Sequence, residues 1–82
     1  MIYRTESIQL ASFLACQKKL TFIGVNKSDL ERVAFVFEPA EAAQQLADAY
    51  FAGRVKVNPL ELFEKYRTLR DLIFEAKTAV IK

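Results

Sequence analysis

A single cysteine, Cys16, and the absence of histidine decide how this 82-residue chain can be stabilised. Small domains often rely on disulfides or a structural metal because they bury a limited fraction of their surface. One cysteine cannot form a disulfide within the chain, and one thiolate without histidine cannot supply the four ligands of a typical zinc site. We therefore predict no metal, no cofactor, and a fold held by a packed apolar core, by self-association, or by both.

The apolar content of the sequence suits such a core. Hydrophobic residues make up 52% of the chain, which argues against disorder. No apolar run approaches the roughly 20 residues that a membrane-spanning helix needs, and residues 1–6 lack the basic stretch and apolar core of a signal peptide. The net charge of +2 permits nucleic-acid binding without arguing for it. We expect one domain, residues 1–82, located in the cytoplasm and without contact to a membrane.

The N-terminal part predicts a short extended segment followed by a helix. Residues 3–5 are either a first strand or an extended lead-in. Thr5 or Ser7 can accept a hydrogen bond from one of the first free backbone N–H groups and so cap a helix that extends to about Gln17. Most apolar residues of this helix share one broad face, but Phe13 lies on the other side. We therefore expect a helix that is buried on more than one face.

A hairpin is predicted next. Two runs rich in β-branched and aromatic residues, 20–25 and 32–37, flank the turn-forming residues 26–29, which favours two antiparallel strands. The period-two geometry of a strand places Phe22 on one face and Val25 on the other. Both faces carry apolar groups, so one face of the sheet is available to something other than this chain's own helices.

Two helices follow the hairpin. Pro39 suits the first turn of a helix that continues to Ala52, and Gly53 is well placed to end it. Asn58 as the capping residue and Pro59 at the first position start a last helix, which extends to about residue 79. The expected inward face of the first of these helices consists of Ala43, Leu46, Ala47 and Tyr50. The apolar seam of the last helix consists of Leu62, Tyr66, Leu69, Ile73, Ala76 and Val80.

The order β-α-β-β-α-α predicts a small α+β domain. An antiparallel hairpin, three-stranded if residues 3–5 pair with it, would pack with three helices.

The residues that usually carry catalysis are scarce. Without histidine there is no imidazole base, and the only glycines, Gly24 and Gly53, are too isolated to form a phosphate-binding loop. Cys16 lies near a helix C-terminus, where the helix dipole opposes a thiolate, so a packed thiol is the favoured interpretation. Four carboxylates fall on one side of the last helix and are interpreted as a solvated outer face: Glu61, Glu64, Asp71 and Glu75. We predict that the chain is not an enzyme.

One flank of the last helix carries both aromatic and basic side chains, namely Phe63, Arg67, Arg70, Phe74 and Lys77. Three interpretations remain open. The plainest is that the two phenylalanines widen the core seam; the second is that the flank packs on another protein subunit, with arginine stems covering apolar surface. In the third, the aromatic rings stack on bases while the basic groups neutralise phosphates.

The chain also resembles a small uncharacterised family of bacterial and mobile-element proteins, a domain of unknown function. The residues that carry this resemblance extend over most of the chain: Tyr3, Arg4, Thr5, residues 10–14, residues 35–37, Tyr50, Gly53, Val57, Pro59, Phe63, Leu69 and Arg70. Gln17 and Lys18 stand where such sequences tend to have a glycine after the first helix. The resemblance implies the α+β fold and transfers no active site.

Our leading hypothesis is a non-catalytic module that binds protein, as a homodimer or with another protein partner. Phe13, Phe63 and Phe74 are the candidate interface residues, because they are aromatic side chains off the main apolar faces. The alternative hypothesis is a small nucleic-acid-binding accessory protein, with Arg67, Arg70 and Lys77 as the candidate contacts.

Overall fold

Six elements make up the fold, in the order that the sequence predicts. The computed structural model describes residues 1–27 and 33–78. The elements are β1 (Tyr3–Thr5), α1 (Ile8–Ala15), β2 (Thr21–Lys27), β3 (Val33–Glu38), α2 (Ala40–Phe51) and α3 (Pro59–Thr78). The small α+β class is confirmed. Parts of two predictions, residues 28–32 of the hairpin and residues 79–80 at the end of the last helix, lie outside the described residues.

The three strands form one antiparallel sheet with β3 in the middle. The strand order is β1-β3-β2. Tyr3 pairs with Phe37 and Thr5 with Phe35, so residues 3–5 are a true first strand rather than a lead-in. The predicted hairpin of β2 and β3 is also confirmed.

A β-bulge in β2 changes which of its side chains face the core. Phe22 pairs with Phe37 and Gly24 pairs with Val36, which leaves Ile23 as the extra residue. Gly24 adopts a φ of 149°, a backbone conformation that glycine accepts readily. The extra residue shifts the alternation, so Phe22 and Val25 both pack against the core, while Ile23 is 51% exposed. The prediction that Phe22 and Val25 lie on opposite faces is therefore wrong.

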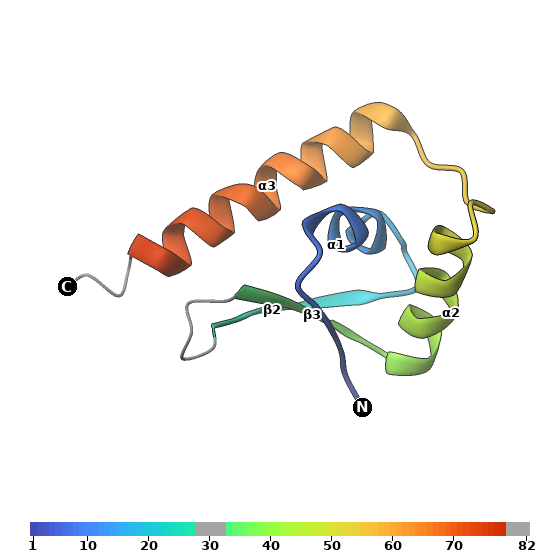
Figure 1. The fold of residues 1–82 in the computed structure, drawn as a ribbon, viewed down its shortest axis with the longest axis horizontal. Coiled ribbons are helices and arrows are strands. Elements are labelled where there is room, and N and C mark those ends of the chain that lie inside the picture. The colour runs from blue at the N-terminus through green and yellow to red at the C-terminus, as the bar shows by residue number, and fades with distance from the viewer. Residues whose placement is uncertain (28–32, 79–82) are drawn as a thin grey trace.

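Helix α1 lies between the sheet and α3, and α2 lies against one end of the sheet (Figure 1). This position explains why five successive residues of α1, Leu10–Leu14, are buried. Burial on more than one face is thus confirmed for this helix. Phe13 is only 2% exposed, and the centre of its ring lies 5.3 Å from that of Tyr50. Phe13 is a core residue, and the expectation that it offers surface to a partner is wrong.

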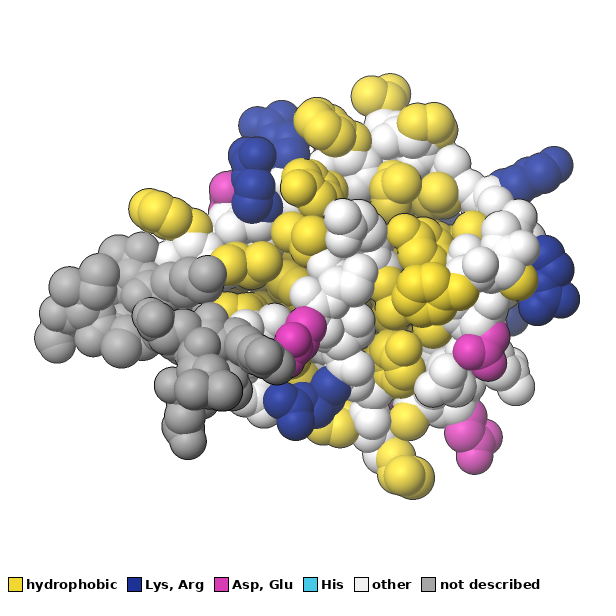
Figure 2. Space-filling model, viewed as in Figure 1, with side chains coloured by type: hydrophobic (Ala, Val, Ile, Leu, Met, Phe, Trp, Pro, Cys, Tyr) yellow, Lys and Arg dark blue, Asp and Glu magenta, His cyan; other side chains and the backbone are white. Residues whose placement is uncertain are grey.

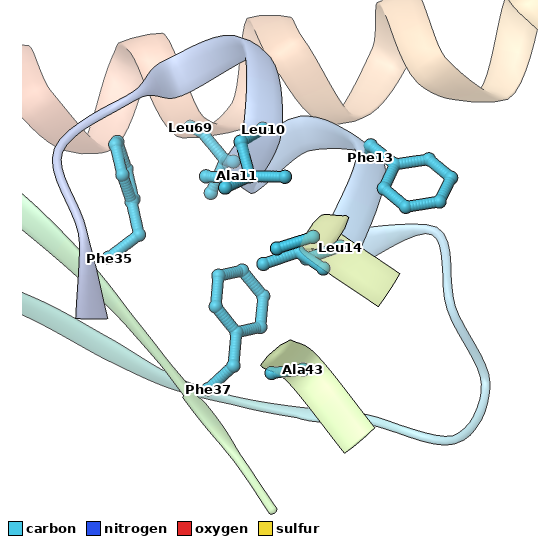
Figure 3. Close-up of a cluster of buried hydrophobic side chains, with 9 residues drawn as sticks. Leu10, Ala11, Phe13, Leu14, Phe35, Phe37, Ala43 and Leu69 are labelled. Atoms are coloured by element: carbon cyan, nitrogen blue, oxygen red, sulfur yellow. The ribbon is translucent and has the colours of Figure 1, made fainter. Parts of the chain in front are cut away.

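The core joins every layer of the fold. Its buried residues come from α1, β3, α2 and α3, and eight of them are labelled in Figure 3: Leu10, Ala11, Phe13, Leu14, Phe35, Phe37, Ala43 and Leu69. Residues of β1 and β2, including Tyr3 and Phe22, pack against this cluster. The rings of Phe22 and Phe37, which oppose each other across the sheet, have centroids 5.3 Å apart.

Local signals in the sequence set most helix ends. The Ser7 hydroxyl accepts a hydrogen bond from the Leu10 N–H at the start of α1. Gly53, with φ of 73°, ends α2 in a Schellman motif in which the Gly53 N–H donates to the Tyr50 carbonyl and the Arg54 N–H to the Ala49 carbonyl.

Helix α3 starts at the predicted cap. The Asn58 Oδ1 accepts hydrogen bonds from the N–H groups of Leu60 and Glu61, at 2.9 and 3.2 Å. The predicted seam follows: Leu69 is buried, and Leu62, Tyr66 and Ile73 are half-buried. The side chains of Ala76 and Val80 lie outside the described part of the chain.

Candidate interaction surface

A shallow groove of about 390 Å3 opens where three helices meet. Its lining residues come from α1, the end of α2 and the first half of α3: Gln9, Ser12, Tyr50, Pro59, Leu62, Phe63 and Tyr66. The lining is mostly apolar, and none of these residues is a carboxylate, a lysine, an arginine or a cysteine. The groove therefore offers shape and apolar surface rather than acid–base chemistry.

Three large apolar side chains beside this groove are exposed. Phe51 at the end of α2 is 70% exposed, and Leu60 and Phe63 in the first turns of α3 are 75% and 59% exposed. The Phe51 ring meets the groove residue Tyr50 edge to face, with centroids 5.3 Å apart. Hydrophobic side chains gather over this region of the molecule in Figure 2. An isolated exposed apolar residue is ordinary, whereas several around one hollow are typical of a binding surface.

The exposed flank of α3 repeats at helical spacing. Leu60, Phe63, Arg67 and Arg70, here called the α3 stripe, follow one another at intervals of three, four and three residues, and all four are exposed. Phe74 continues this spacing and is 71% exposed. The interpretation that Phe63 and Phe74 widen the core seam is therefore wrong. The side chain of the third basic candidate, Lys77, lies outside the described residues.

The outer face of α2 carries the opposite charge. Glu41, Gln44, Asp48 and Phe51, here called the α2 stripe, also follow at intervals of three, four and three residues and are all exposed. The Gln44 side-chain amide donates to the Asp48 carboxylate at 2.9 Å. No lysine or arginine occurs between Ala40 and Phe51, so this face has a net negative charge.

The acidic side of α3 is a solvated surface, as predicted. Glu61, Glu64, Asp71 and Glu75 are all exposed. Within the residues that the structure describes, no group of three or more metal-binding side chains comes together.

Cys16 is a half-buried, packed side chain. Burial is the main cause that raises the pKa of its thiol, and the nearby Glu61 carboxylate raises this pKa further, while Lys65 acts in the opposite direction. A raised pKa disfavours the reactive thiolate. This agrees with the interpretation of Cys16 as a packed thiol.

Three lysines from distant parts of the sequence border another hollow, of about 420 Å3. Lys18 and Lys19 follow α1 and Lys56 precedes α3, and the hollow between them also contains Glu61. The sequence alone does not bring these lysines together, because the turn after α1 and the link before α3 meet only in the folded chain.

Of the six candidate residues, the structure exposes four and buries one. Phe63, Arg67, Arg70 and Phe74 lie along one flank of α3, and Phe13 lies in the core. Sequence reasoning missed Leu60 and Phe51. The spacing of Leu60 from Phe63 was an available signal in the sequence. No local sequence signal distinguishes the exposed Phe51 from its half-buried neighbour Tyr50.

Comparisons with protein-family models, with curated proteins and with solved structures find no match for this chain. Among the described helices, none combines the length and the apolar character needed to cross a membrane.

Proposed function

We propose that this chain is a non-catalytic protein-interaction module that self-associates as a homodimer through the groove between α1, α2 and α3. The observation that carries the proposal is the exposure of Phe51, Leu60 and Phe63 around a mostly apolar hollow. Aromatic residues set in or beside a hollow are typical anchors of protein interfaces.

The expected affinity is modest. Covering the exposed part of one of these three side chains contributes about 1–2 kcal/mol. A symmetric dimer contains two copies of each side chain, so the contribution of each is counted twice. Association costs at least several kcal/mol of translational and rotational freedom, so only part of this gain remains. We therefore expect a dissociation constant in roughly the micromolar range or weaker.

Sedimentation velocity on two serine variants tests the proposal. Phe63→Ser removes an exposed side chain that lines the groove, and Ile23→Ser removes a similarly exposed side chain on the β2 bulge. We expect Phe63→Ser to weaken self-association at least about tenfold, which corresponds to 1.4 kcal/mol, and Ile23→Ser to leave it unchanged. Equal effects of the two variants would show that the groove is not the interface.

The proposed cytoplasmic location fits the cysteine content. The 82 residues contain one cysteine and therefore no disulfide of their own. Domains of this size in oxidising compartments are often rich in disulfides.

Nucleic-acid binding is the alternative function that a specific observation favours. Arg67 and Arg70 are exposed beside Phe63, and neither guanidinium forms an ion pair with another described residue. Both are therefore available to phosphates, with Lys77 as a further candidate from the sequence. Binding to mixed-sequence DNA or RNA should weaken steeply with added salt and should be abolished when Arg67 and Arg70 are both replaced by Glu. Absence of retention at low salt would exclude this function.

A further inference from the structure

The two exposed stripes have complementary patterns. The α3 stripe reads apolar, apolar, basic, basic from Leu60 to Arg70, and the α2 stripe reads acidic, polar, acidic, apolar from Glu41 to Phe51. Each stripe spans ten residue steps, about 15 Å of helix. Alternating intervals of three and four residues are the spacing with which two helices pack along a common seam.

Antiparallel pairing joins one apolar pair and one pair of opposite charges along the seam. With Phe51 beside Phe63, the next position along the seam sets Asp48 beside Arg67. Arg70 then lies beside Gln44, and Glu41 falls beside Phe74. Parallel pairing that keeps Asp48 beside Arg67 instead sets Phe51 beside Arg70.

Within one chain these stripes do not pair, because α2 and α3 lie along different directions and both stripes are exposed (Figure 1). We infer that a second copy of this chain is the occupant: α2 of each copy lies antiparallel on the α3 stripe of the other, in a two-fold dimer. This inference rests on the proposed self-association and specifies its geometry. A two-fold axis exchanges the two contacts, so each copy supplies one α2 stripe and one α3 stripe.

The pairing also explains what fills the groove. Phe63 lines the groove, so a Phe51 ring from the second copy, placed beside Phe63, lies at its mouth. Covering these rings would remove from water two of the most exposed apolar side chains of the described residues.

The flanking residues do not oppose the pairing. Glu64 lies between Phe63 and Arg67 on α3, and the residues that lie between Phe51 and Asp48 on α2, Ala49 and Tyr50, are uncharged. The paired charges are exposed before association, so their attraction is screened by salt. We expect the charged pairs to set the partner and orientation, and the aromatic contact to supply most of the affinity.

Charge reversal with rescue by mixing tests the geometry. Arg67→Glu places two carboxylates together at both contacts of the dimer, and Asp48→Lys places two cations together. Each variant alone should raise the dissociation constant at least about tenfold, measured by sedimentation velocity at low salt. An equimolar mixture of the two variants should recover dimers, because each contact of the mixed dimer then joins opposite charges. Lys18→Glu and Glu6→Lys, which reverse exposed charges outside both stripes, are the matched controls and should leave association unchanged.

The outcomes separate this inference from the function on which it rests. A wild-type dimer that both variants weaken and that mixing restores supports the inference. A wild-type dimer that is insensitive to both variants, or that mixing fails to restore, overturns this geometry while self-association stands. A wild-type chain that stays monomeric overturns both, and if that monomer retains DNA through Arg67, phosphates are the partner of the α3 stripe instead.

Discussion

Two alanine substitutions, Phe13→Ala and Phe63→Ala, should act on different properties, the first on folding stability and the second on self-association, although both remove a phenylalanine ring from a helix. The Phe13 ring is 2% exposed and lies 5.3 Å from the Tyr50 ring. Its loss leaves a cavity in a closed core, which costs about 3–5 kcal/mol of unfolding free energy. A chain of this length has roughly 4–12 kcal/mol in total, at 0.05–0.15 kcal/mol per residue, so Phe13→Ala should leave a marginally stable protein.

Phe63→Ala should cost much less in stability. The Phe63 ring is already 59% exposed. Since full burial of such a side chain contributes about 1.5–3 kcal/mol, the loss of its buried part should cost only about 1 kcal/mol. Self-association, by contrast, should weaken in Phe63→Ala, because this ring lines the groove.

Urea denaturation followed by circular dichroism at several protein concentrations measures both effects, and the method suits a chain without tryptophan. A loss of stability that depends on protein concentration reports the dimer, and a loss that is constant reports the core. If Phe13→Ala proves too unstable to purify, Phe13→Leu should show a smaller constant loss. Equal constant losses for Phe13→Ala and Phe63→Ala would refute the division between core and surface.

Three further substitutions test the helix ends and the thiol. Asn58→Ala should lower the unfolding free energy by about 1 kcal/mol, because Asn58 Oδ1 accepts the N–H groups of Leu60 and Glu61; an unchanged urea midpoint would contradict this role. Gly53→Ala should cost about 1–2 kcal/mol, because Gly53 has a φ of 73°; thermal unfolding measures it, and a stabilised variant would show that the Schellman turn tolerates a side chain. Because burial and the Glu61 carboxylate raise the pKa of Cys16, its thiolate forms only at higher pH than in a free cysteine. Alkylation by iodoacetamide at pH 8 should therefore be slower than for a cysteine peptide and faster in Glu61→Gln, and the opposite order would show that another group controls the thiol.

Much of the fold can be predicted because its signals are local. Asn58 and Pro59 mark the start of α3 through capping, and Gly53 marks the end of α2 through its positive φ. The inward face of α2 follows from helical periodicity, and Ala43 and Ala47 are indeed buried.

The errors arise where tertiary structure overrides local pattern. Strict alternation fails in β2 because Ile23 is an extra residue in a bulge; Gly24 inside the strand was the available signal. Phe13 lies off the main apolar face of its helix, yet it is buried because α1 lies between the sheet and α3. The groove joins three helices, so no single segment of sequence predicts it.

The solution mass of the wild-type chain across protein concentration and salt tests the central claim most directly. One chain has a mass of 9.4 kDa. We predict that light scattering shows a mass that rises with concentration toward twice this value, and that added salt shifts the rise to higher concentration. A mass of one chain at every concentration up to the millimolar range would contradict self-association.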